Sequence, residues 1–269
     1  MAMPPPSSDT TCVVTGASSG IGTEIARELA RRGYNLTLVG RRENRLVKLA
    51  DELREDFDVI ATPIACDVRD SDQRTELIRE AQRGSRSIAA LVNNAGLGAA
   101  GRFASVGEER ALAMIDTNIR ALVSLSRLAL PAMIENESGA IMNVASTAGF
   151  QPIPTEAVYS ASKAFVVNFS DALGRELLGS GVSCTALCPG PTATEFASVA
   201  GIENGFDSLP RFVVADASEV AQAGVDAMIR GKRICVPGAL NKLGAFAGSK
   251  APRPVVLKTL DTFWPAADH

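Results

Sequence analysis

The chain has 269 residues, of which 46% are hydrophobic and 21% are charged, and its formal net charge is −3. That length suffices for one large α/β domain or two small ones, and the weak negative charge gives no reason to expect nucleic acid as a partner. The only histidine, His269, is the last residue, which removes Ser-His-Asp and Cys-His catalysis and any histidine metal site, so no metal is expected.

Residues 1–9 are rich in proline and serine and have neither a basic nor an apolar signal-peptide region, so we expect a flexible segment there. No run of about 18 apolar residues is present, and none of the five cysteines forms a CxxC pair. Four cysteines lie in or at the end of apolar runs, which favours free thiols in a reducing compartment. These features predict a cytoplasmic protein.

A strand–helix–strand unit with a glycine-rich turn is predicted near the start of the chain. Apolar runs over 11–14 and 36–39 predict buried strands, and an apolar stripe between them predicts a helix. The turn after the first strand contains Gly16, Gly20 and Gly22, spaced as GxxxGxG. Such glycines let the backbone approach a pyrophosphate, which the helix N-terminus can bind. A tight turn without a ligand is the alternative.

The end of the second strand bears on the choice of cofactor. An acidic side chain here would bind both ribose hydroxyls and repel a 2′-phosphate, but the chain reads Val39-Gly40-Arg41-Arg42. Guanidinium groups pair with phosphate through charge-assisted hydrogen bonds. We therefore expect NADP(H) rather than NAD(H), with Arg41 as the firmer contact, because Arg42 could be a solvated charge at a helix start.

The alternation of strands and helices continues along the chain. Further strands are predicted over 59–64, 88–92, 139–146 and 182–188, and helices over 43–57, 72–83, 105–135 (one or two helices) and about 155–178. Pro63 indicates an edge position or an irregular end for the third strand. This pattern predicts one α/β domain over 10–238, with a doubly wound parallel sheet of about seven strands and helices on both faces.

Polar residues follow several of these strands. Asp67 comes after the third strand, where it could accept a hydrogen bond from an adenine amino group or merely cap a turn. Asn93 and Asn94 end the fourth strand and could tie neighbouring strands through their amides. Asn118 lies in a predicted helix interior, which is mildly unfavourable and suggests a specific hydrogen bond, although an exposed polar position is equally compatible.

Tyr159 and Lys163 are four residues apart, which places them on one face of the predicted helix. A phenol with an ordinary pKa near 10 transfers protons poorly at neutral pH, and a neighbouring ammonium lowers that pKa. Taken alone, the pair is more typical of two surface residues on a helix. Ser146 at the end of the fifth strand and the Pro189-Gly190 turn after the sixth argue for a site.

These motifs together have the order and spacing of the short-chain dehydrogenase/reductase family, which the chain resembles over about residues 10–238. The resemblance implies a Rossmann-type fold and four catalytic residues. Tyr159 would exchange a proton with the substrate oxygen, and Lys163 would lower the pKa of Tyr159 and bind the nicotinamide ribose. Ser146 would orient the carbonyl, and Asn118 would hold a water that links Lys163 to solvent.

The motifs and the resemblance together give the expected cofactor contacts. They are Gly16, Ser18, Ser19, Gly20, Ile21, Gly22, Arg41, Arg42, Asp67, Val68, Asn94, Ala95, Gly96, Tyr159, Lys163, Pro189, Gly190, Thr192 and Thr194. The expected activity is NADP(H)-dependent interconversion of a carbonyl and a secondary alcohol. An NAD-dependent alcohol dehydrogenase and a non-catalytic dinucleotide-binding sensor are the alternatives.

The remaining segments bear on substrate and assembly. The loop over about 190–215 could form an apolar substrate pocket with Phe196, Phe206, Leu209 and Phe212. The sequences around Tyr159 and Pro189 also resemble bacterial reductases of the very-long-chain 3-oxoacyl reductase and 17β-hydroxysteroid dehydrogenase group, so a hydrophobic ketone or a 3-oxoacyl compound is favoured. Residues 239–269 are expected to pack on the domain or a partner subunit rather than on a membrane surface. The resemblance suggests a homodimer or homotetramer through the helices of 105–135 and 155–178.

Overall fold

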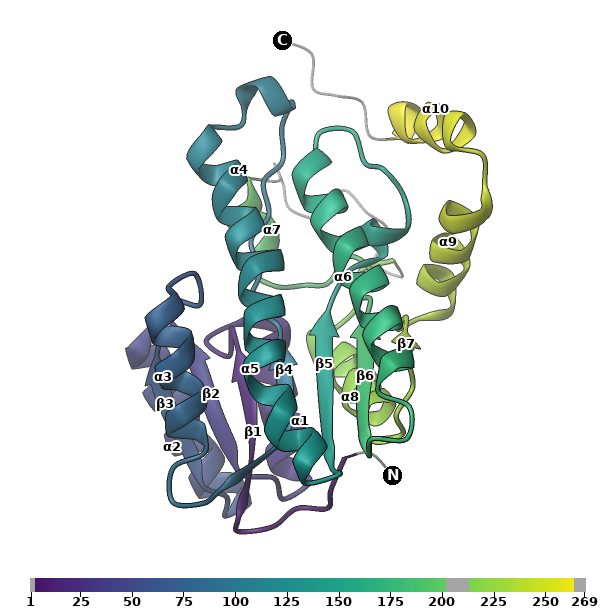
Figure 1. Ribbon diagram of the computed structural model, residues 1–269. Coiled ribbons are helices and arrows are strands. Elements are labelled where there is room, and N and C mark those ends of the chain that lie inside the picture. The colour runs from purple at the N-terminus through teal and green to yellow at the C-terminus, as the bar shows by residue number, and fades with distance from the viewer. Residues whose placement is uncertain (1–2, 202–212, 264–269) are drawn as a thin grey trace.

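Seven strands form one parallel sheet within residues 3–201 and 213–263, the part of the chain that the computed structural model describes. Their order is β3-β2-β1-β4-β5-β6-β7 (Figure 1). The strands are β1 (Thr10–Thr15), β2 (Leu36–Gly40), β3 (Ala61–Ala65), β4 (Ser87–Asn93), β5 (Gly139–Val144), β6 (Val182–Leu187) and β7 (Ile234–Cys235). This order confirms the predicted doubly wound sheet and puts β3, with Pro63, at an edge. The strand order reverses between β1 and β4, where such sheets bind ligands.

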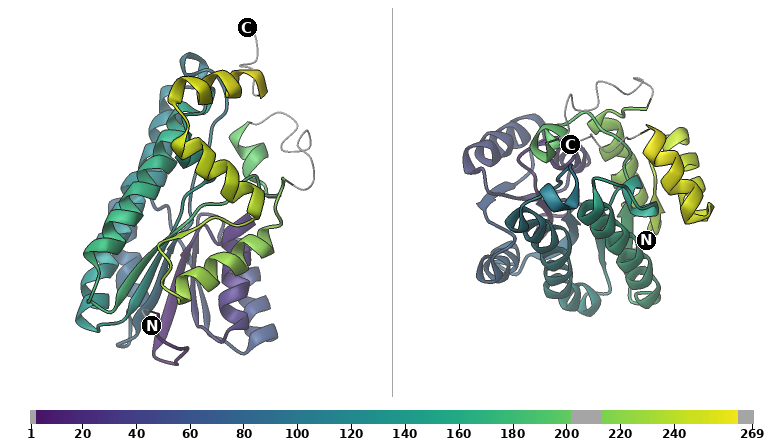
Figure 2. Two further views of the ribbon diagram at one scale, coloured as in Figure 1. Left: turned by 90° about the vertical axis from the view of Figure 1, so that its right-hand side faces the viewer. Right: turned by 90° about the horizontal axis from the view of Figure 1, so that it is seen from above.

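Helices cover both faces of the sheet (Figures 1 and 2). One face carries α1 (Gly20–Arg31), α2 (Glu43–Phe57) and α8 (Ala217–Ile229), and the other carries α3 (Ser71–Ala81), α5 (Leu122–Glu135) and α6 (Ala157–Glu176). Because successive strand residues point to opposite faces, Cys12 and Val14 join the first core and Val13 joins the second. The predicted burial of four thiols is confirmed, since Cys12, Cys66, Cys184 and Cys188 are buried and free.

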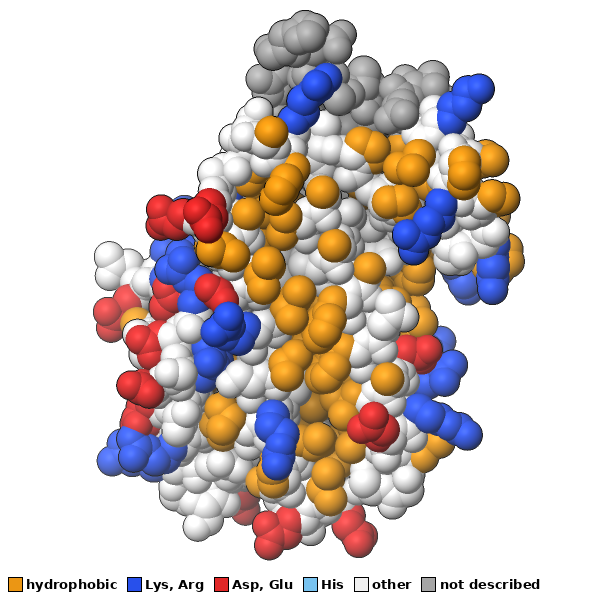
Figure 3. All heavy atoms as spheres, turned by 45° about the horizontal axis from the view of Figure 1, so that its top comes forward, with side chains coloured by type: hydrophobic (Ala, Val, Ile, Leu, Met, Phe, Trp, Pro, Cys, Tyr) orange, Lys and Arg blue, Asp and Glu red, His pale blue; other side chains and the backbone are white. Residues whose placement is uncertain are grey.

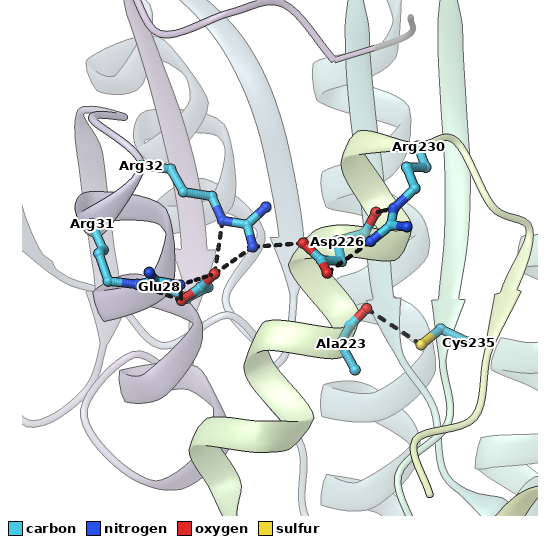
Figure 4. Close-up of polar contacts among 7 residues, drawn as sticks. All are labelled: Glu28, Arg31, Arg32, Ala223, Asp226, Arg230 and Cys235. Atoms are coloured by element: carbon cyan, nitrogen blue, oxygen red, sulfur yellow. Dashed lines mark hydrogen bonds and ion pairs between the residues drawn. The ribbon is translucent and has the colours of Figure 1, made fainter. Parts of the chain in front are cut away.

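A chain of charged side chains joins α1 to α8 at the periphery of the first core (Figure 4). Arg32 donates to Glu28 at 2.7 Å and to Asp226 of α8 at 2.6 Å. Asp226 also accepts from Arg230 at 2.8 Å, and Glu28 pairs with Arg31. Because all of these groups except the buried Glu28 are partly exposed, the network orients α1 and α8 relative to each other more than it stabilises the fold.

The predicted helical region 105–135 is interrupted in the middle. A short 3-10 turn (Phe103–Ser105) leads to α4 (Glu108–Ile115), and a π-helical segment, Asp116–Ala121, joins α4 to α5. A π segment shifts the helix register by one residue and is frequent at functional sites. Here it carries Asn118, which is only 2% exposed, so the interpretation of Asn118 as an exposed polar position is wrong.

Two helices follow the last strand and lie beside the top of the sheet (Figure 2). They are α9 (Ala239–Lys250) and α10 (Arg253–Phe263). The first packs against a 3-10 turn, Thr147–Phe150, and it lies so close to Gly190 that a Cβ there would collide with the Asn241 side chain. Apolar side chains on both helices stay exposed, among them Leu243 and Phe246. None of the helices among the described residues has the length and apolar character to span a bilayer.

Candidate active site

A cavity of about 520 Å³ opens at the carboxyl ends of the strands, on both sides of the β1–β4 reversal. It runs from the glycine turn and the end of β2 to the start of α6. Every catalytic or cofactor-binding residue predicted from the sequence lines it except Gly22 and Asn118. Gly22 packs closely against Gly16 and Asn94, and Asn118 hydrogen-bonds to the backbone of Leu97; all three partners line the cavity.

The glycine turn brings backbone, not side chains, to the cavity. Gly16 has a φ of +68°, a conformation that glycine adopts without strain. A Cβ at Gly22 would collide with the Gly16 carbonyl and the Asn94 amide, so only glycine lets α1 approach this closely. Ser19, the N-cap of α1, makes no side-chain capping bond. The first amides of α1 are therefore suited to receive an anion such as a pyrophosphate.

In the middle of the cavity wall, the side-chain amides of asparagines form hydrogen bonds between neighbouring elements. Asn94 donates through Nδ2 to the Thr15 carbonyl at 2.9 Å, which ties β4 to β1. Asn93 donates to Asn143 Oδ1 of β5 at 2.9 Å, and Asn143 donates to Ser170 of α6 at the same distance. These bonds confirm the prediction that the paired asparagines join neighbouring strands. They leave the small residues Ala95 and Gly96 facing the cavity.

The two arginines at the end of β2 have different surroundings. Arg42 donates to Ser19 Oγ at 2.6 Å and pairs with Glu195 at 3.0 Å, so it is more than a solvated charge at a helix start. Arg41 is exposed and lies close enough to Asp67 to favour its ionised form. A hydrogen bond from Arg69 contributes most to holding the pKa of Asp67 below its usual value. Both guanidinium groups line the cavity and can reach a phosphate there.

Ser146, Tyr159 and Lys163 converge at the far end of the cavity. Ser146 follows β5, and its hydroxyl lies close enough to the Tyr159 phenol on α6 to act on its pKa, while it donates to the Pro189 carbonyl at 3.5 Å. Lys163 Nζ lies 5.7 Å from the centroid of the Tyr159 ring and donates to the Val144 carbonyl at 2.8 Å. Lys163 is only 5% exposed. A hydroxyl, a phenol and an ammonium thus come together from two elements.

Burial acts on the two ionisable groups of this site in opposite directions. It raises the pKa of Tyr159 above the ordinary phenol value, an effect that the nearby Ser146 hydroxyl opposes and the charge of Glu156 reinforces. Burial also lowers the pKa of Lys163 to about 8. The pKa of the phenol therefore differs from the expectation of a lowered value, because the effect of burial outweighs that of its polar neighbours.

Asn118 acts on the wall of the cavity through the backbone of Leu97. Its Oδ1 accepts from the Leu97 amide at 2.8 Å, and its Nδ2 donates to the Leu97 carbonyl at 2.9 Å and to Ser162 Oγ at 3.0 Å. A Cβ on Gly96 would lie 3.5 Å from both Asn118 Oδ1 and Lys163 Nζ. The missing side chain of Gly96 leaves space between these two polar atoms.

Apolar side chains surround the mouth of the cavity beside Tyr159. The Phe196 ring, in α7 (Phe196–Ala200), lies 5.4 Å from the Tyr159 ring between centroids. Leu97, Ile153, Val199 and Leu260 line the same region, whereas the predicted pocket residues Phe206, Leu209 and Phe212 lie outside the described residues.

Besides Arg69 and Glu195, which also line the cavity, sequence reasoning missed a charged residue of the wall beside Tyr159, namely Glu156. Its position one helical turn before Tyr159 is a signal that could have identified it.

Comparisons with known proteins agree with this geometry. The family model for short chain dehydrogenases matches residues 10–203. The chain is 42% identical to a sulfoacetaldehyde reductase of Chromohalobacter salexigens over 215 residues, which cover 78% of this chain and 84% of that protein. Among solved structures, a short-chain dehydrogenase from Sphingobium yanoikuyae in complex with NADPH is 31% identical, with a TM-score of 0.80 over 97% of this chain and 98% of that one. A variant of actinorhodin polyketide ketoreductase with NADPH is 34% identical, with a TM-score of 0.79 over 88% and 97%.

Proposed function

The chain belongs to the short-chain dehydrogenase family, and from this premise we propose that it is an NADP(H)-dependent carbonyl reductase. The observation that carries the proposal is the convergence of Ser146, Tyr159 and Lys163 at one end of a cavity whose other end holds the glycine turn and two arginines. A binding protein without catalysis would have no need of a phenol beside a hydroxyl and a buried ammonium, so the sensor alternative is disfavoured.

The residues of the cavity fit a dinucleotide phosphate. The backbone of the glycine turn and the N-terminus of α1 would hold the pyrophosphate. Arg41 and Arg42 would bind the 2′-phosphate, and no carboxylate at the end of β2 opposes this choice. Asp67 and Val68 would meet the adenine. The other proposed contacts are Ser18, Ser19, Asn94, Ala95, Gly96, Pro189, Gly190, Thr192 and Thr194.

The proposed chemistry divides between the cofactor and the chain. The nicotinamide, when bound, exchanges a hydride with the carbonyl carbon. Ser146 Oγ orients and polarises the carbonyl oxygen, and Tyr159 donates its proton to that oxygen. A phenol with a raised pKa remains protonated at neutral pH, which suits reduction. Lys163 and Asn118 flank the space beside Gly96, through which a water could return a proton to Tyr159.

The proposed substrate is a ketone or a 3-oxoacyl compound with an apolar body. The support for this class is the set of apolar side chains at the cavity mouth, Leu97, Ile153, Phe196, Val199 and Leu260. Burial of such a body against them would place the carbonyl beside Ser146 and Tyr159.

Cofactor titration tests the proposal most directly. Fluorescence titrations of wild type and Arg41→Ala should show NADPH binding at least about tenfold tighter than NADH, and Arg41→Ala should remove about 1.4 kcal/mol of that preference. Tyr159→Phe should keep NADPH binding and lose ketone reduction by a factor of at least about 100. Equal binding of NADH would contradict the proposed cofactor, and full activity of Tyr159→Phe would contradict the proposed acid.

A further inference from the structure

The Glu156 carboxylate lies in the wall of the cavity on the substrate side. It lines the cavity together with Ile153 and Tyr159, and it is half-buried. It is the N-cap residue of α6, and the helix places it one turn ahead of Tyr159. Its charge acts on the Tyr159 phenol, so the carboxylate is within electrostatic reach of the reacting group.

The backbone around Glu156 is held firmly. The Glu156 amide donates to the Ile153 carbonyl at 3.1 Å, and the Glu156 carbonyl accepts from the Ser160 amide at 2.8 Å. Thr155 has a φ of +67°, which is strained for a β-branched residue, and its carbonyl accepts from Gly101 at 2.9 Å. A strained and fully bonded turn therefore sets where the carboxylate lies.

Glu156 differs from the other carboxylates of the cavity in having no cation beside it. Asp67 pairs with Arg69 at 2.6 Å, and Glu195 pairs with Arg45 at 2.8 Å. Among the described residues, Glu156 has no ion pair and no capping bond to α6, and burial alone raises the pKa of its carboxyl. A half-buried carboxylate without a counter-charge is costly, and a ligand that brings a cation would relieve that cost.

The described cation beside the cavity mouth is bonded to backbone, because Arg110 donates to the Gly98 and Val199 carbonyls at 2.6 Å. Gln151 and the apolar side chains of the mouth line the cavity together with Glu156. Lys163 is bonded to Val144, and in the proposed function it serves the cofactor. Among the described carboxylates of the cavity, Glu156 is therefore the one whose charge is not balanced by an ion pair, and the apolar side chains of the mouth strengthen its effect on a bound charge.

We propose that Glu156 is a specificity-determining residue that selects carbonyl substrates carrying a cationic amine on an apolar body and disfavours substrates carrying a carboxylate, sulfonate or phosphate. This inference rests on the proposed function, because it concerns the substrate of the same site. The amine would pair with Glu156 while the carbonyl meets Ser146 and Tyr159.

Three methyl ketones that differ only in their distal group provide the test. They are (5-oxohexyl)trimethylammonium, its uncharged tert-butyl isostere 7,7-dimethyloctan-2-one, and 6-oxoheptanoate. With NADPH, wild type should favour the cation over the isostere in kcat/KM by at least about tenfold, and the anion should be worse than the isostere by a similar factor. The preference should reside mainly in KM and should weaken as the pH falls and Glu156 becomes protonated.

Glu156→Gln should abolish both discriminations, each measured as a ratio of kcat/KM between two ketones in the same variant, so that a change common to all three ketones cancels. Glu135→Gln, an exposed change of the same charge at the end of α5, should behave like wild type. The inference is overturned if wild type shows no preference for the cation, or if Glu156→Gln retains that preference.

The test separates this inference from the proposed function. If no ketone is reduced, the proposed function fails, and the inference fails with it. If the uncharged ketone is reduced without any charge preference, only the inference fails. Calorimetric titration of the NADPH complex with hexyltrimethylammonium and heptanoate adds a readout that is independent of turnover, and equal binding of the two probes would also overturn the inference.

Discussion

At the scale of single residues, burial favours the uncharged form of both Tyr159 and Lys163. The pKa of the phenol is raised, and that of the ammonium is lowered to about 8. In the proposed reduction, a protonated Tyr159 would be ready to donate its proton. Oxidation requires the phenolate, which a positively charged nicotinamide nearby would stabilise.

Titration of tyrosinate absorbance measures whether the pKa of Tyr159 is raised, because the chain has only two tyrosines. Burial raises the pKa of Tyr34 as well, so Tyr34→Phe isolates Tyr159. Without cofactor, we expect Tyr159 to ionise only above pH 10. Saturating NADP⁺ should lower its pKa by at least about one unit. Ionisation at or below pH 10 without cofactor would contradict the dominance of burial, and Tyr34→Phe/Tyr159→Phe should show no signal.

For two glycines in helices, we predict opposite effects of substitution by alanine on the free energy of unfolding. Alanine usually stabilises a helix interior by about 0.5–1 kcal/mol relative to glycine. At Gly22 the new Cβ would collide with Gly16 and Asn94, so Gly22→Ala should lower the free energy of unfolding by about 1–3 kcal/mol and weaken NADPH binding.

Gly244→Ala in α9 is the matched control for Gly22→Ala. Among the described residues, no heavy atom outside the helix backbone lies within 4 Å of a Cβ at Gly244. This variant should gain up to about 1 kcal/mol in α9 and leave NADPH binding unchanged. Urea unfolding and cofactor titration measure both effects. A Gly22→Ala protein at least as stable as wild type would refute the close approach of α1 to the glycine turn.

At the scale of elements, an ion pair links the start of α2 to the segment before α7. Glu195 pairs with Arg42 at 3.0 Å and with Arg45 at 2.8 Å, and the side chains are 43–50% exposed. Such a pair contributes little stability in water. A 2′-phosphate that binds Arg42 has to compete with the Glu195 carboxylate.

Glu195→Gln should therefore tighten NADPH binding by about three- to tenfold, because a negative group next to the phosphate is removed. Binding of NADH, which has no 2′-phosphate, should stay the same. Glu55→Gln, an exposed change on the same helix α2, should affect neither cofactor. Weaker NADPH binding in Glu195→Gln would show that the carboxylate supports the site rather than competing with the phosphate.

At the scale of the whole molecule, the buried thiols make stability sensitive to alkaline pH. Burial raises the pKa of Cys66 to about 11 and those of Cys184 and Cys188 to about 12, from 9.0. These thiols stay protonated in the folded chain while the unfolded chain loses their protons. The stability that they provide is full below pH 9 and is lost as the pH rises through 9 to 12. The contribution of Lys163 to stability changes with pH in the opposite direction, because its pKa is lower in the folded chain than in the unfolded chain.

The free energy of unfolding should consequently fall between pH 9 and 10, and each thiol should contribute up to about 1.4 kcal/mol per pH unit. Urea unfolding across this range measures the slope. Cys184→Ala should make the fall of the unfolding free energy with pH less steep, because one thiol no longer contributes to it. This holds whatever the effect of the substitution on stability at neutral pH. An unchanged slope would mean that this thiol also ionises in the folded chain.

The surface of the whole molecule carries apolar side chains over α5 and α6 and over α9 and α10 (Figure 3). Leu128, Ile134 and Phe165 are among the exposed residues of the first group, and Leu243 and Phe246 belong to the second. The first group lies on the helices expected to join subunits. A homodimer or homotetramer stays a prediction.

The sequence by itself determined the sheet and the glycine turn, and with the family resemblance it pointed to Ser146, Tyr159 and Lys163 as the proposed catalytic residues. These features depend on local chemistry: alternating apolar runs, glycines at a turn, and four-residue spacing on a helix. Strand ends were predicted to within about two residues, as for β3, because the terminal residues of a strand carry little pattern of their own.

Only the tertiary structure decided how distant residues act on one another. The π segment that buries Asn118 depends on packing against Leu97 and Ser162, which the helical pattern of 105–135 does not encode. The raised pKa of Tyr159 and the unpaired charge of Glu156 depend on burial, which is a property of neighbours brought together by folding. The sequence specifies which ionisable groups are present. The folded cavity sets their protonation states, because burial at low polarity shifts their pKa values away from those in water.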